Sequence, residues 1–105
     1  MVNAKKNIFE DDMYVLLELT KGGQARKKIL EILQFRPRNC NQVAHQLGSD
    51  WWTVHKHLRH LIRTGLVSTI DFGRIKFYKL TPKGESALKL VSSKVSENNL
   101  LEVSP

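Results

Sequence analysis

The fold is decided by the stretch Asp50–Val67, DWWTVHKHLRHLIRTGLV, near the middle of the 105-residue chain. Apolar residues recur in it at i, i+4, i+7 and i+8: Val54, Leu58, Leu61 and Ile62. This spacing predicts an amphipathic helix with one buried face. Asp50 is expected to cap the first turn by accepting backbone N–H groups, and Gly65 to end the helix through a positive φ angle.

The opposite face of this helix is basic and can donate hydrogen bonds. It is formed by Trp52, His55, Lys56 and Arg59, and no acidic residue follows Asp50 in the stretch. A helix that is buried on one side and cationic on the other suits the major groove of DNA.

Two helices are expected before this stretch. The first runs from about Gln24 to Phe35, with an inward face of Ile29, Ile32 and Leu33, and Pro37 follows its end. Asn39 and Gln42 have the spacing of a capping box, which predicts a short helix carrying Val43, Ala44 and Leu47. This short helix and the basic helix after it have the order of a helix-turn-helix.

A β-hairpin is expected next. Leu66–Phe72 and Ile75–Leu80 are rich in β-branched and aromatic residues, and Gly73-Arg74 between them is a tight-turn signal. Tyr78 is predicted to face the core together with Leu80, while Lys76 and Arg74 point outward.

Helices are also expected near both ends of the chain. Phe9–Thr20 has an apolar face, and Gly22 and Gly23 follow it as a stop signal. Thr81 and Pro82 are predicted to be the N-cap and first residue of a last helix over residues 82–98. This last helix carries more apolar surface than a peripheral helix needs. We therefore expect both terminal helices to take part in dimerisation.

Composition limits the possible partners. The chain has 17 Lys and Arg against 10 Asp and Glu, a net charge of +7, and the whole excess lies between residues 24 and 84. One basic surface between slightly acidic ends predicts a polyanion as partner.

The single cysteine, Cys40, cannot form an intrachain disulfide, and no apolar run is long enough for a membrane span. A cytoplasmic protein of one domain, residues 1–105, without membrane contact is expected.

The stretch from residue 24 to 85 resembles the winged helix-turn-helix of ArsR and MarR-like transcriptional regulators. The resemblance rests on the joint order and spacing of short pieces: Thr53-Val54, His57-Leu58, Leu61, Gly65-Leu66-Val67, Tyr78-Lys79-Leu80-Thr81 and Gly84. It implies a homodimer in which terminal helices pair and two recognition helices enter successive major grooves. The fold class expected is mainly α with a small β-hairpin (α+β), with a winged-helix core at 24–81.

The resemblance also implies which residues contact DNA. On the recognition helix these are Trp51, Trp52, Thr53, His55, Lys56 and Arg59. On the wing, residues 71–76, they are Arg74 and Lys76. Lys56 and Arg59 can bind phosphates, and an arginine can also grip guanine bidentately. The two tryptophans depart from the family pattern, so one indole can pack on the neighbouring helix while the other, Trp52, contacts thymine methyls.

Metal, cofactor and catalytic functions are not expected. Cys40 is a lone cysteine, and of the three histidines on the recognition helix only His57 and His60 lie within reach of one ion. The sequence has no phosphate-binding glycine loop, metalloprotease motif or nucleophile elbow, so we predict no enzyme and no cofactor. No effector pocket for a small molecule is evident.

The sequence therefore predicts a homodimeric, sequence-specific regulator of transcription, most simply a repressor, that inserts the helix at 50–64 into the major groove of double-stranded DNA. Two alternatives remain open at this point. The same fold can package DNA without reading its sequence, and winged helices also serve as protein–protein adaptors.

Overall fold

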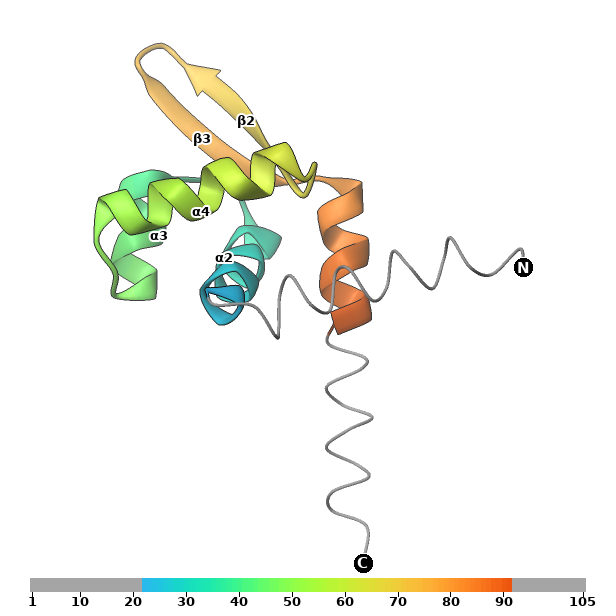
Figure 1. The fold of residues 1–105 in the computed structure, drawn as a ribbon. Helices are drawn as coiled ribbons and strands as arrows, with labels where there is room; N and C mark the ends of the chain where they lie inside the picture. Colours follow the sequence, from blue (N-terminus) through green and yellow to red (C-terminus); the bar gives the residue numbers. More distant parts are fainter. Residues whose placement is uncertain (1–21, 92–105) are drawn as a thin grey trace, which may run out of the picture.

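Seven helices and strands follow one another in the part of the chain that the structure, a computed structural model, describes, residues 22–91 (Figure 1). They are α2 (Gly23–Phe35), β1 (Arg38–Asn39), α3 (Cys40–Leu47), α4 (Trp51–Arg63), β2 (Val67–Phe72), β3 (Ile75–Leu80) and a last helix at 82–91. The predicted helix at 9–20 and the predicted continuation of the last helix to residue 98 lie outside the described residues. Within residues 22–91, no helix is long and apolar enough to cross a membrane.

The predicted helix caps are present. The Asn39 side chain accepts the Gln42 N–H at 2.8 Å, and the Gln42 side chain accepts the Asn39 N–H at 2.9 Å, which completes a capping box at α3. At α4, Asp50 Oδ1 accepts the Thr53 N–H at 2.9 Å. Gly65 has a φ of 79° just beyond this helix, as predicted. These local contacts fix where both helices of the helix-turn-helix begin.

The sheet has three antiparallel strands in the order β1-β3-β2. The hairpin of β2 and β3 agrees with the prediction, and Val67 pairs with Leu80 at its base. The edge strand β1 was not predicted. It pairs Arg38 with Tyr78 and so attaches the start of α3 to the hairpin.

One core joins all the helices to the base of the hairpin. Its buried residues are Ile29, Leu30, Leu33, Cys40, Val43, Ala44, Val54, Leu58, Leu61, Leu66, Val67, Tyr78, Ala87, Leu88 and Val91. The predicted burial of Ile62 is wrong, because this side chain is 38% exposed. Each residue turns about 100° around a helix, which places Ile62 at the edge of the arc that Val54, Leu58 and Leu61 bury.

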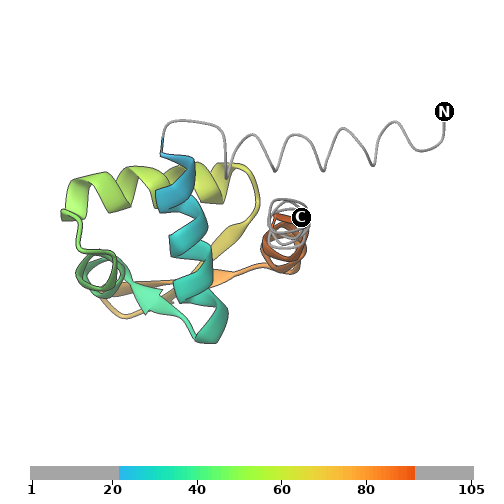
Figure 2. The same cartoon turned by 90° about the horizontal axis from the view of Figure 1, so that it is seen from below.

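The helices lie on one side of the hairpin base, and the hairpin projects beyond them (Figure 1). Seen from below, α2 crosses the middle of the molecule, with α3 on one side and the helix at 82–91 on the other (Figure 2). The inner face of α4 is covered by this layer. Its outer face remains open to solvent beside the projecting hairpin.

Candidate nucleic-acid interface

A straight stripe of exposed side chains runs along the whole of α4. Trp52, Lys56, Arg59 and Arg63 follow one another at i, i+4, i+7 and i+11, which places them on one face of the helix. Trp52 is 70% exposed, and α4 contains no acidic residue. Three of the four were predicted as site residues. Arg63 was not, although it continues the same spacing.

The N-terminal end of α4 carries an aromatic cluster. The Trp51 indole stacks on the His55 imidazole, with ring centroids 4.6 Å apart and planes inclined by 10°, and it meets Trp52 edge-on at 4.9 Å. Trp51 therefore packs on its own helix, and the packing of one indole on the neighbouring helix stays a prediction. Trp52 projects into solvent, which leaves its predicted contact with DNA sterically open.

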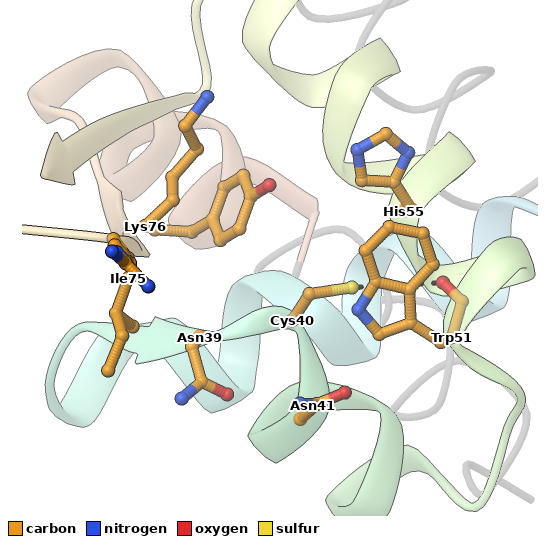
Figure 3. A pocket seen from close by; sticks show the side chains of 9 residues that line it. Asn39, Cys40, Asn41, Trp51, His55, Ile75 and Lys76 are labelled. Carbon is orange, nitrogen blue, oxygen red and sulfur yellow. Dashed lines mark hydrogen bonds between the residues drawn. The ribbon is translucent and has the colours of Figure 1, made fainter.

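A cleft of about 430 Å³ separates this aromatic cluster from the hairpin. Figure 3 shows Trp51 and His55 on one side of it, Ile75 and Lys76 on the other, and the start of α3 between them. The residues that line it are Asn39, Cys40, Asn41, Trp51, His55, Arg74, Ile75, Lys76 and Tyr78. Two predicted site residues of the helix thus lie opposite two of the hairpin, and the described part of the chain contributes no carboxylate to the lining. The sequence showed no sign of this cleft, which has room for a small molecule.

Hydrogen bonds hold the hairpin and α4 in a fixed relation. Thr81 follows β3, and its hydroxyl donates to the Gly65 carbonyl at 2.6 Å, while its N–H donates to the Leu66 carbonyl at 3.1 Å. Lys83 Nζ donates to the Thr64 carbonyl at 2.9 Å. The end of α4 is therefore bonded to the base of the hairpin. Arg74 lies exposed at the turn, at the opposite end of the hairpin.

Solved structures with the same arrangement include a transcriptional regulator and a protein in complex with DNA. The transcriptional regulator BldR from Sulfolobus solfataricus matches with a TM-score of 0.70 at 20% identity, over 98% of this chain and 81% of that one. The MarR protein of Staphylococcus aureus, in complex with salicylate and kanamycin, matches with a TM-score of 0.66 at 25% identity, over 75% of this chain. ZitR of Lactococcus lactis, in complex with DNA, matches with a TM-score of 0.62 at 19% identity, over 80% of this chain. This chain has the winged-helix fold.

The winged-helix comparisons concern the fold only. The chain spans 55% of the staphylococcal protein and 61% of the ZitR chain. No protein-family model matches the sequence, and no curated protein is similar to it. In this fold, α3 and α4 are the helix-turn-helix, and the hairpin β2–β3 is the wing.

Thr53 has a structural role in this winged helix. Its N–H and its hydroxyl both donate to the Asp50 carboxylate, the hydroxyl at 2.7 Å. These bonds from Thr53 lower the pKa of Asp50, so the cap is charged at neutral pH. The predicted DNA contact of Thr53 would therefore involve a side chain that the cap already orients.

Two histidines of α4 turn toward the interior. Burial lowers the pKa of His57 and of His60, and the positive charge of Arg26 on α2 lowers both further. Both imidazoles are therefore held neutral at neutral pH. Within residues 22–91, no group of three or more His, Cys, Asp or Glu side chains could hold a metal ion.

Cys40 is buried beneath the cleft. Its thiol donates to the Trp51 carbonyl with a sulfur–oxygen distance of 3.7 Å, and burial raises the pKa of the thiol. Both features keep it protonated, so it has the character of a packing residue that links the start of α3 to the start of α4.

Proposed function

We propose that this chain is a sequence-specific regulator of transcription that binds double-stranded DNA through α4 and the wing. The observation that carries the proposal is the exposed stripe on α4, which has three cationic side chains and no acid and is held beside a basic wing. A helix of this kind fits the major groove, and a wing beside it reaches the flanking backbone or minor groove.

The side chains of the interface would have different roles. Lys56 binds phosphate, Arg59 donates to O6 and N7 of a guanine, and Trp52 contacts a thymine methyl or a sugar. Trp51 and His55 form the aromatic edge of the same surface. Arg74 and Lys76 bind phosphates or the minor groove next to the site. Phosphate contacts then supply most of the affinity, and Arg59, His55 and Trp52 most of the discrimination between sequences.

We further propose that the protein acts in the cytoplasm as a homodimer and represses by occupying a promoter. A dimer would place two copies of α4 in successive major grooves, one helical turn of DNA apart. The segments expected to form the dimer interface, residues 9–20 and 82–98, have apolar faces in the sequence. A monomeric mass by sedimentation at micromolar concentration would contradict this part of the proposal.

The experiment that tests the function is a binding titration against random-sequence and genomic DNA fragments at about 50 and 200 mM salt. The proposal predicts enrichment of a palindromic site whose binding persists at the higher salt. Equal binding to all fragments that falls steeply with salt would instead support an architectural DNA-binding protein. Absence of binding at both salt concentrations would support a protein–protein adaptor.

A further inference from the structure

A second, smaller cavity lies on α4 itself, beyond the aromatic cluster. It has a volume of about 170 Å³, and its lining consists of Lys56, Arg59, His60 and Arg63. All four side chains end in nitrogen, and no acidic side chain of residues 22–91 lines the pocket. The C-terminal half of α4 therefore presents a cationic pocket, whereas its N-terminal half presents aromatic rings.

These cations are not needed to stabilise the end of the helix. Basic side chains often bind the last carbonyl groups of a helix, which lack partners within it. Here the carbonyls of His60, Leu61 and Ile62 accept hydrogen bonds from the backbone N–H groups of residues 64–66. The Thr64 carbonyl accepts one from Lys83. The end of the helix is therefore capped without the side chains of the four lining residues.

The arrangement is unfavourable for the isolated protein. Arg59 and Arg63 are four residues apart on a helix, the spacing at which like charges repel. Lys56 lies one turn before His60 and adds a third cation to the same pocket. A negatively charged group bound between these side chains would remove the repulsion.

We propose that this cationic pocket binds a backbone phosphate of the DNA, held by Lys56 and Arg63 above the imidazole of His60. The proposal rests on the proposed function. It gives Arg63, the last member of the exposed stripe, a defined ligand, and it adds His60, which the sequence analysis did not assign to the interface, to the lining of that site. Arg63 can present two parallel N–H groups to one phosphate, and Lys56 adds a point charge one turn before His60.

The proposal divides α4 into two functional halves. The aromatic half, with Trp51, Trp52 and His55, reads the groove, and the cationic half fixes the register of the helix on one strand. Arg59 stands between the halves and lines the pocket, so it can reach a base while the phosphate is bound to its neighbours.

Binding of a phosphate also affects the pKa of His60. The groups that face this imidazole are Arg26 from α2 and, on α4 itself, His57, Arg63 and the other cations of the pocket. Their positive charge opposes a charge on the imidazole, and a phosphate next to Arg63 offsets this field. The pKa of His60 is therefore expected to rise when the pocket is filled.

The first test compares Arg63→Gln with Lys28→Gln, which removes the same charge from the exposed face of α2. Arg63→Gln is expected to weaken binding of the enriched site and of random DNA by the same factor. It should also lower the slope of log K against log salt by about one, whereas Lys28→Gln changes neither. Circular dichroism verifies that both variants are folded. The proposal is overturned if Arg63→Gln behaves like Lys28→Gln or weakens only the enriched site.

The second test needs no DNA and separates this proposal from the proposed function. Inorganic phosphate is titrated into the protein while the histidine ring protons are followed by NMR, and His60→Gln identifies the His60 signal. We expect the pKa of His60 to rise with phosphate in the wild type and to stay constant in Arg63→Gln. If DNA does not bind but His60 responds, the pocket is a site for free phosphate and the regulator function fails. If DNA binds and neither Arg63→Gln nor phosphate has an effect, the function stands and the pocket proposal fails.

Discussion

Replacing Gly84 with alanine is expected to destabilise the fold, against the usual effect of this change in a helix. A Cβ atom at residue 84 would lie 2.2 Å from the Leu66 carbonyl oxygen and 2.9 Å from Leu80 Cδ1. Both distances are too short, and the nearer neighbour is backbone that cannot rotate away. The same Leu66 oxygen accepts the Thr81 N–H at 3.1 Å, so a shift of this carbonyl strains the bond that closes the wing.

The magnitude follows from three contributions to the free energy of unfolding. Alanine in place of glycine inside a helix contributes about 0.5–1 kcal/mol in favour of the folded state. Overpacking against fixed neighbours costs about 1–3 kcal/mol, and weakening of the Thr81 bond costs about 0.5–1.5 kcal/mol. The net expectation for Gly84→Ala is a loss of about 0.5–4 kcal/mol.

Urea unfolding followed by circular dichroism measures this difference. Ser86→Ala is the matched control, because Ser86 is exposed on the same helix and its replacement should change stability by no more than about 0.5 kcal/mol. If Gly84→Ala is as stable as Ser86→Ala, the helix at 82–91 does not pack against the Leu66 backbone as closely as the structure shows, and the reasoning is refuted.

Three further predictions concern binding and pH. Arg59→Ala should weaken the enriched DNA site by about 1–3 kcal/mol and relax specificity at one base pair, whereas an unchanged specificity profile in a selection assay would assign Arg59 to a phosphate. Lys76→Ala should weaken all sequences evenly and lower the salt slope by about one, and a loss confined to one sequence would contradict a phosphate role. Burial lowers the folded-state pKa of His57 and His60 from 6.5. The contribution of these two neutral imidazoles to the free energy of unfolding should therefore be fully present above pH 6.5 and be lost as the pH falls below it, through the lowered pKa values. A urea midpoint that stays constant between about pH 7.5 and 5 would exclude this effect.

The helix-turn-helix could be predicted because its boundaries depend on local chemistry. Asn39 with Gln42 and Asp50 with Thr53 form their caps within one helical turn, so the sequence contains both partners of each bond. The strand β1 has only two residues, too few for an alternating pattern, and it forms because β3 offers a free edge. Pairing of this kind depends on contacts between segments that are far apart in the sequence, and the spacing of apolar residues gives no information about such contacts.

The candidate site likewise has residues that the sequence predicts and features that depend on tertiary structure. Trp52, Lys56 and Arg59 were found from helical spacing alone, and the same spacing would have given Arg63. The cleft between His55 and Lys76 could not be found in this way, because it depends on the register and tilt of the hairpin relative to α4. The stack of Trp51 on His55 depends on side-chain rotamers, which the order of residues does not determine.

The bonds from Thr81 to Gly65 and from Lys83 to Thr64 have a mechanical consequence. They join positions 16 and 19 residues apart, so the chain from the end of α4 through the wing to the last helix forms a closed ring. A displacement of the helix at 82–91 then acts on the end of α4 and the base of the hairpin together. In the proposed dimer, such a displacement would change the distance between the two proposed DNA-binding surfaces without unfolding either of them.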